Sequence, residues 1–283
     1  MAVAVPGGLR VEPVGNVGTL LRRLRAEAAG CPVALGVDFP LGLPREYARL
    51  HGSRAADFPA FLRGVRPGFM DVCATLDEVS AARPFYPRRG AKGMTRLAHA
   101  QALGLADAGG LSRACDRATA DRPAGAPLFW TLGANQTGKA ALSAWRDLLL
   151  PSLDEVALWP FEGPLLRLLQ PGRVAVAETY PAEAMRQLGL RMNGSKRRQA
   201  DRQALGGLLR AAMARLGVAP DPALSAWLDA GFGADAAGED RFDCVLGVLC
   251  VLQVLAGQRT DAAPADPWVQ KWEGWVLGQA WAG

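Results

Sequence analysis

Two short apolar runs, far apart in the chain, end in the same way. Residues 33–38 read Val-Ala-Leu-Gly-Val-Asp and residues 174–178 read Val-Ala-Val-Ala-Glu, and a proline follows each run within three residues. An apolar run without alternation predicts a strand that is covered on both faces. In open α/β sheets, ligands bind at the carboxyl ends of such strands. The pattern therefore predicts two buried strands that present Asp38 and Glu178 at one edge of a sheet.

Helical spacing of apolar residues predicts most of the other elements. The predicted helices cover residues 17–29, 45–50, 58–63, 70–82, 96–105, 140–149, 181–188, 195–216, 221–228 and 241–256. Trp268, Trp272 and Trp275 would share one face of a final helix, a spacing that is typical of core residues. Residues 1–5 and 9–14 predict a β-hairpin near the start of the chain.

The order of these elements predicts an α/β fold. With 283 residues, the chain is long enough for one large domain, which we expect to span residues 1–283. Prolines divide residues 39–158 into short helical pieces and loops. We therefore expect a mostly helical insertion, over residues 45–160, that covers one end of the sheet.

The composition argues against a disulfide-rich, zinc-binding or membrane-spanning protein. The formal charge of +5 permits an anionic substrate without requiring one. Five widely spaced cysteines without a C-x-x-C pair argue against disulfides and zinc, and two histidines are too few for a His-rich metal site. The start of the chain does not resemble a signal peptide, and the longest apolar run, residues 244–256, is shorter than the roughly 20 residues of a membrane span. We expect a cytoplasmic protein without a membrane partner; the sequence does not specify its oligomeric state.

Carboxylates are the strongest chemical signal. Residues 239–243 read Glu-Asp-Arg-Phe-Asp, so Asp240 and Asp243 would share a helix face. Hard divalent ions take several oxygen ligands, and two such ions about 4 Å apart can activate water and stabilise the leaving oxygen of a phosphodiester. We therefore predict that Asp38, Glu178, Asp240 and Asp243 bind Mg²⁺ or Mn²⁺, with Asp38, Glu178 and Asp243 as catalytic residues. The alternatives are helix capping by Asp240 and Asp243, and a turn-stabilising role for Glu178.

Two further stretches suggest anion binding. Residues 133–140 read Gly-Ala-Asn-Gln-Thr-Gly-Lys-Ala, which differs from the phosphate-binding pattern G-x-x-x-x-G-K-[ST] only at Ala140. ATP binding is therefore one hypothesis, and a glycine turn that leads into a helix is the alternative. Basic residues around Phe85 and Tyr86, and again at residues 196–198, suit a nucleic-acid strand, although solvated surface is the ordinary explanation. The expected substrate-binding residues are Asn135, Gln136, Lys139, Lys196 and Arg197.

Several of these motifs together resemble a known family. Residues 36–44, 177–181, 195–197 and 240–243 resemble, in this order, the motifs of the family of unknown function numbered four-two-nine, whose members are described as predicted nucleases of the RNase H fold. Residues 129–130, 135–139, 145 and 159–161 look like its helical middle section, and residues 273–275 look like its tail. The resemblance implies an RNase H-like mixed sheet flanked by helices, with acidic metal ligands.

One feature of the sequence departs from that pattern. An RNase H-like fold opens with a strand that carries the first catalytic Asp, and a second strand follows. No acidic residue precedes Glu12, and residues 1–5 look like the second strand. Either the chain starts one strand late or it lacks a principal metal ligand. The leading hypothesis is a metal-dependent nuclease or phosphodiesterase; the alternative is a catalytically inactive nucleic-acid- or nucleotide-binding protein of the same fold.

Overall fold

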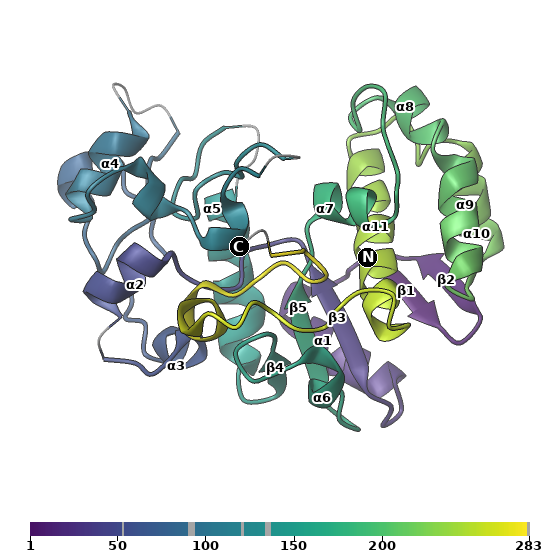
Figure 1. Ribbon diagram of the computed structural model, residues 1–283, viewed down its shortest axis with the longest axis horizontal. Helices are drawn as coiled ribbons and strands as arrows, with labels where there is room; N and C mark the ends of the chain where they lie inside the picture. Colours follow the sequence, from purple (N-terminus) through teal and green to yellow (C-terminus); the bar gives the residue numbers. More distant parts are fainter. Residues whose placement is uncertain (53, 90–93, 120–121, 134–136, 282–283) are drawn as a thin grey trace.

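A parallel three-stranded sheet forms the centre of the molecule (Figure 1). The computed structural model describes residues 1–283 except 53, 90–93, 120–121, 134–136 and 282–283. The strand order is β3 (Val33–Val37), β5 (Val174–Glu178), β4 (Val156–Leu158), and Val37 lies opposite Glu178. The two strands predicted from the apolar runs are therefore neighbours. Strand β4 was not predicted, because three apolar residues are too few to show a periodicity.

A second sheet lies beside the first and has mixed strand directions. The predicted hairpin is present as β1 (Ala2–Val5) and β2 (Gly8–Val11), which are antiparallel. The two-residue strand β6 (Ala219–Pro220) runs parallel to β2 on its other side. The α/β class is thus confirmed, and the strands are divided between two three-stranded sheets.

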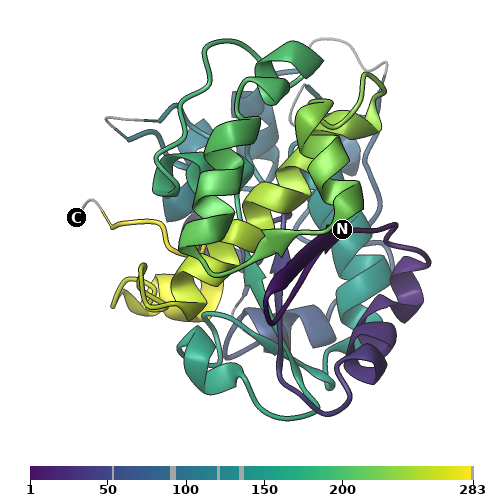
Figure 2. The same cartoon turned by 90° about the vertical axis from the view of Figure 1, so that its right-hand side faces the viewer.

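Helix α11 (Ala237–Leu255) connects the two sheets through its packing. It contacts β1, β2 and β3 as well as α7 (Pro181–Gln187). Most of its apolar side chains are buried, which the predicted helix over residues 241–256 anticipated, although the helix begins four residues earlier. Figure 2 shows α11 passing behind the second sheet, with α9 (Gly206–Arg215) and α10 (Pro222–Asp229) beside it.

The remaining helices are short. They are α1 (Leu20–Glu27), α2 (Arg45–His51), α3 (Phe58–Arg63), α4 (Arg96–Ala102), α5 (Thr137–Ala144), α6 (Leu165–Leu168) and α8 (Gln199–Gln203). A π-helical segment, Trp145–Leu149, continues α5. Between β3 and β4 the described residues form short helices, turns and isolated bridges, while the domain boundaries, including the insertion over residues 45–160, stay a prediction.

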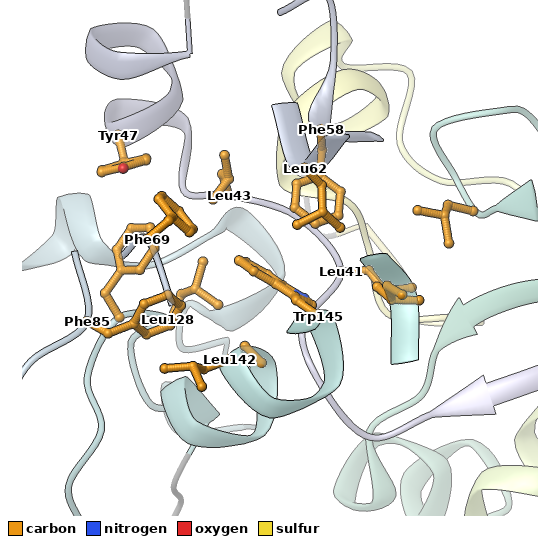
Figure 3. Close-up of a cluster of buried hydrophobic side chains, with 14 of the residues drawn as sticks. Leu41, Leu43, Tyr47, Phe58, Leu62, Phe69, Phe85, Leu128, Leu142 and Trp145 are labelled. Atoms are coloured by element: carbon orange, nitrogen blue, oxygen red, sulfur yellow. The ribbon is translucent and has the colours of Figure 1, made fainter. Parts of the chain in front are cut away.

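Aromatic and leucine side chains pack together between this helical section and the central sheet. Trp145, Phe58 and Phe85 are fully buried, and the ring centroid of Trp145 lies 5.2 Å from that of Phe58 and 6.2 Å from that of Phe85 (Figure 3). The indole Nε1 of Trp145 donates a hydrogen bond of 2.8 Å to the carbonyl oxygen of Pro40. Since Pro40 comes two residues after Asp38, this core fixes the chain that leaves β3.

Three helix predictions were wrong. Residues 70–82 contain a single 3-10 turn, Leu76–Glu78, because Cys73 makes backbone hydrogen bonds with Phe85 and Arg88 instead of with its own neighbours. Residues 195–216 form α8 and α9 rather than one helix, and the break precedes Gly206 and Gly207, which lower helix propensity. The final segment is helical only over residues 267–273, so Trp275 lies beyond the end of the helix, although Trp272 and Trp275 are buried as expected for core residues. Among the described residues, no helix is both long and apolar enough to cross a membrane.

Candidate functional site

Four of the predicted site residues come from the same region of the fold. Asp38 follows directly after β3, and Glu178 is the last residue of the neighbouring strand β5. Asp240 and Asp243 lie in the first turns of α11, which packs against β3. The negative charges of Glu178, Asp240 and Asp243 each raise the pKa of Asp38. The carboxyl ends of the two parallel strands and the start of α11 thus gather the acidic residues that the sequence singled out.

Glu178 is held by an arginine rather than left open. Its two carboxylate oxygens accept hydrogen bonds of 2.6 and 2.7 Å from the guanidinium of Arg113, and Oε2 accepts a third, of 2.8 Å, from the backbone N–H of Leu41. The side chain of Arg113 is fully buried and that of Glu178 is 7% exposed. Burial raises the pKa of Glu178, and Arg113 opposes that effect. A metal ion at Glu178 would have to displace a two-pronged ion pair.

Arg113 is itself the centre of a buried network. Its Nε and Nη2 also donate to the carboxylate of Asp116, at 2.9 and 3.0 Å, and Nη1 donates to the carbonyl oxygen of Leu41 at 3.1 Å. A buried guanidinium with two carboxylate partners stabilises the positions of three separate chain segments. Arg113 was not among the predicted site residues, since an isolated arginine in this part of the sequence carries no local signal that distinguishes it from a solvated one.

Asp38 is the open carboxylate of the site. Its residue is exposed to solvent, in contrast to buried Val37 before it, yet enough protein atoms surround the carboxyl group to desolvate it in part. This desolvation, followed by the negative charge of Asp243, raises the pKa of Asp38 to about 7, and the positive charge of Lys196 limits the rise. A carboxylate of this kind favours a proton or a cation at neutral pH.

Asp243 is paired with Lys196. The Lys196 ammonium lies 2.5 Å from Oδ2 of Asp243 and 3.3 Å from the carboxylate of Glu239. The other oxygen, Oδ1 of Asp243, is buried without a hydrogen-bond partner in the described residues. Burial raises the pKa of Asp243 to about 6 despite the lysine. Desolvation alone would lower the pKa of Lys196, but Asp243 and Glu239 raise it.

A second buried arginine, Arg202, holds the segment that carries Lys196 in place. The guanidinium of Arg202 is 1% exposed and donates to the carbonyl oxygens of Lys196, Gly231 and Gly233. The carboxylate of Asp201 accepts a hydrogen bond of 2.8 Å from the backbone N–H of Ser195. Lys196 therefore projects toward α11 from an anchored loop, which makes it a fixed part of the acidic site.

The donor set fits a divalent ion only in part. Within the described residues, no group of three or more His, Cys, Asp or Glu side chains is placed to hold a metal ion. Asp38 and Asp243, with the unpartnered Oδ1 of Asp243, are nevertheless suitable oxygen donors. Mg²⁺ commonly binds through one or two carboxylates and completes its shell with water and substrate phosphate. Asp38 and Asp243 would supply that number of carboxylates, whereas the expected larger ligand set that includes Glu178 would require Arg113 to move.

The other expected contacts are not brought into this cluster by any interaction of the described residues. Lys139 is half-buried in the first turn of α5, and Arg197 is exposed next to Lys196. Asn135 and Gln136 lie outside the described residues. Phe85 and Tyr86 are buried at 0% and 2% exposure, so these two rings cannot stack on the bases of a bound strand.

Neither the family models, nor the curated proteins, nor the solved structures gave a match to this chain.

Proposed function

We propose that the protein is a metal-dependent phosphodiesterase that acts on nucleic acid, with Asp38 and Asp243 as its metal ligands. The observation that carries the proposal is the pair of carboxylates with raised pKa values at the ends of β3 and the first turns of α11. Two carboxylates that repel each other in a partly desolvated site gain most from a shared divalent cation. An RNase H-like arrangement and membership of family four-two-nine belong to the same proposal.

In this proposal Asp38 and Asp243 would hold Mg²⁺ or Mn²⁺ through their carboxylate oxygens, which include the buried, unpartnered Oδ1 of Asp243. When bound, the ion would polarise a phosphate oxygen and lower the pKa of a water molecule. Asp240, three residues before Asp243 on α11, is exposed and its negative charge acts on Asp38, so it would contribute charge rather than a direct ligand. Glu178 would position Leu41 and Arg113 rather than bind the ion.

Lys196 would have a double role. Without substrate it neutralises Asp243 at 2.5 Å. Because its side chain is 39% exposed, it can also contact a phosphate that enters the site from solvent. Arg197, exposed beside it, would bind a neighbouring phosphate. Lys139, in the first turn of α5, remains a proposed substrate contact together with Asn135 and Gln136.

The test is a metal titration with matched variants. Mn²⁺ binding is measured by electron paramagnetic resonance at pH 8 for the native chain, Asp38→Asn, Asp243→Asn and the control Asp77→Asn, which changes an exposed aspartate in a separate 3-10 turn. We expect each site variant to lose Mn²⁺ binding and the control to keep it. Cleavage of labelled single-stranded DNA and RNA, with Mg²⁺ and with chelator, is then compared among the same proteins. Equal Mn²⁺ binding by all four proteins would refute the proposal.

One observation favours a second candidate, a nucleic-acid- or nucleotide-binding protein without catalysis. Lys196 already supplies Asp243 with a cation, so the acidic cluster of the described residues is partly neutralised from within. A lysine in this place suits a site that binds phosphate through positive charge alone. Binding of labelled single strands that needs Lys196 but no divalent ion would favour this candidate over the enzyme.

A further inference from the structure

Strand β3 and helix α11 make a close packing contact next to the acidic site. Two glycines take part in it: Gly36, in β3, and Gly247, in α11. Gly36 precedes Asp38 by two residues, and Gly247 follows Asp243 by four residues, which is about one helical turn. Each glycine therefore lies a short distance along the backbone from one of the two proposed metal ligands.

Thr179 fills the space between the two glycines. It comes directly after β5, is 3% exposed, and donates a backbone hydrogen bond of 2.8 Å to the carbonyl oxygen of Val37 in β3. A β-carbon added to Gly36 would lie 2.9 Å from Cγ2 of Thr179. A β-carbon added to Gly247 would lie 3.2 Å from Oγ1 of the same side chain. The methyl branch of Thr179 thus faces β3, and its hydroxyl branch faces α11.

Val251 closes the same contact from the helix. It lies four residues beyond Gly247 and is 4% exposed, and its Cγ2 would lie 2.9 Å from a β-carbon on Gly36. Carbon atoms rest in contact at about 3.5–4.0 Å, so any side chain at residue 36 would push its neighbours away. Thr179 and Val251 are β-branched and buried, so neither can turn its methyl group aside at little cost. Helix and strand approach this closely because residue 36 is glycine.

This contact bears on how far apart the two carboxylates lie. Thr179 is joined to β5 by the chain and to β3 by its hydrogen bond, so it belongs to the sheet and does not travel with α11. Packed protein interiors have low compressibility and transmit a displacement instead of absorbing it. A shift of α11 against Thr179 would therefore change the separation between Asp38, which follows β3, and Asp243, which lies on α11.

We propose that Thr179 is a positioning residue that fixes the separation of Asp38 and Asp243, and that this fixed separation makes the site select Mg²⁺ or Mn²⁺ over Ca²⁺. The selectivity rests on the proposed function, whereas the positioning does not. Mg²⁺ requires oxygen ligands at about 2.0–2.1 Å in nearly octahedral geometry, while Ca²⁺ accepts ligands at about 2.3–2.6 Å in flexible geometry. Carboxylates on rigid elements can meet the stricter requirement of the smaller ion, and a wider or looser site favours Ca²⁺.

The test adds single methyl groups to the contact and then removes the groups that they meet. Gly36→Ala places a methyl group against Thr179 and Val251, and Gly247→Ala places one against Oγ1 of Thr179. Thr179→Ser with Val251→Ala removes the methyl groups that Gly36→Ala would meet and keeps the hydroxyl group, so the triple variant should restore the native spacing. The matched control is Gly207→Ala, at an exposed glycine of α9 whose added β-carbon would meet no atom of the described residues within 4 Å.

Two quantities are measured for each protein: the separation of the Asp38 and Asp243 Cα atoms in crystals without metal, and the dissociation constants of Mg²⁺ and Ca²⁺ by isothermal titration calorimetry. We expect Gly36→Ala to widen the separation by about 0.5 Å, since the added carbon starts about that far inside contact distance. Mg²⁺ affinity should fall about tenfold and Ca²⁺ affinity by less than about twofold. Gly247→Ala should have a smaller effect in the same direction although alanine favours a helix, which separates the effect from a loss of stability. The triple variant and Gly207→Ala should keep the native values.

Folded Gly36→Ala and Gly247→Ala proteins with the native separation would overturn the proposal, because α11 would then accept an extra methyl group without moving. A widened separation that Thr179→Ser with Val251→Ala does not reverse would also overturn it. An equal loss of Mg²⁺ and Ca²⁺ affinity would overturn the selectivity. A native chain that binds neither ion would refute the proposed function and the selectivity with it, whereas a widened separation in Gly36→Ala would still support the positioning role of Thr179.

Discussion

The ion pair of Glu178 and Arg113 offers the sharpest test of how the site is built. Glu178→Gln keeps the shape of the side chain and removes its negative charge. Arg113 would lose the carboxylate that receives hydrogen bonds of 2.6 and 2.7 Å, while Asp116 and the Leu41 carbonyl would remain its partners. The amide group that replaces one oxygen would also direct N–H donors toward a guanidinium or toward the Leu41 N–H, neither of which can accept them.

The expected cost follows from the burial of both groups. Breaking a buried ion pair by removing one partner typically costs about 3–5 kcal/mol, because the other charge stays buried. A hydrogen bond to a charged group contributes about 1.5–3 kcal/mol. Since Asp116 still compensates Arg113, we expect Glu178→Gln to lower the free energy of unfolding by about 2–4 kcal/mol. For a chain of this size, that loss lowers the melting temperature by roughly 4–8 °C.

The assay combines denaturant unfolding with the Mn²⁺ titration. Glu178→Gln should lower the unfolding midpoint but leave the Mn²⁺ affinity of Asp38 and Asp243 within about twofold of the native value, equal to a difference near 0.4 kcal/mol. The exposed Asp77→Asn serves as the control and should change stability by less than about 0.5 kcal/mol. A stable Glu178→Gln protein that has lost Mn²⁺ binding would refute the reasoning, because it would make Glu178 a metal ligand and not a structural partner of Arg113.

Four other predictions concern the site and the core that supports it. The pKa of Asp38 is raised in the folded chain to about 7, so its contribution to the free energy of unfolding is present at low pH and is lost as the pH rises through 7. Native protein should therefore show a urea midpoint that falls between pH 5 and pH 8, and Asp38→Asn should make that fall smaller. The same raised pKa values predict that Mn²⁺ affinity, measured by titration, increases from pH 5 to pH 8 as protons leave Asp38 and Asp243, and a pH-independent affinity would contradict this. Lys196→Met should strengthen Mn²⁺ binding severalfold, because Asp243 loses its competing cation, whereas Arg198→Met, at an exposed residue of the same loop, should not. Trp145→Ala should cost about 3–5 kcal/mol in an unfolding titration, since it removes a fully buried indole from the aromatic cluster.

The elements with strong periodicity could be predicted from the sequence, and the elements defined by distant partners could not. Residues 58–63 and 45–50 were placed almost as the structure has them, because proline or glycine marks their ends. The predicted helix over residues 70–82 failed because its backbone groups bond to residues 85 and 88, and helical spacing of apolar residues does not register such competition. The two-residue strand β6 depends on a backbone contact with β2, more than two hundred residues earlier, so no local pattern could indicate it.

The candidate site shows the same limit at the level of single side chains. Asp38 and Glu178 have almost identical sequence settings, each at the end of an apolar strand and shortly before a proline. The structure gives them different surroundings: Asp38 meets solvent, Asp243 and Lys196, while Glu178 meets Arg113 and the N–H of Leu41. Strand pattern determines where a carboxylate lies, but the partner that arrives from elsewhere in the chain determines whether it stays available for chemistry.

That difference also explains why two adjacent carboxylates can coexist at one sheet edge. If Glu178 were as open as Asp38, the two like charges at neighbouring strand ends would raise each other's pKa values strongly and would destabilise the fold at neutral pH. Arg113 offsets this repulsion for Glu178 by pairing with it in the interior, and Asp116 binds the same guanidinium through Nε and Nη2. Asp38 has no such ion-pair partner within the described residues. The positive charge of Lys196 acts on it from a distance, while Lys196 itself pairs with Asp243. The unsatisfied member of the pair is therefore the one that faces solvent, which is where a cation, a proton or a phosphate-bound metal ion would have to enter.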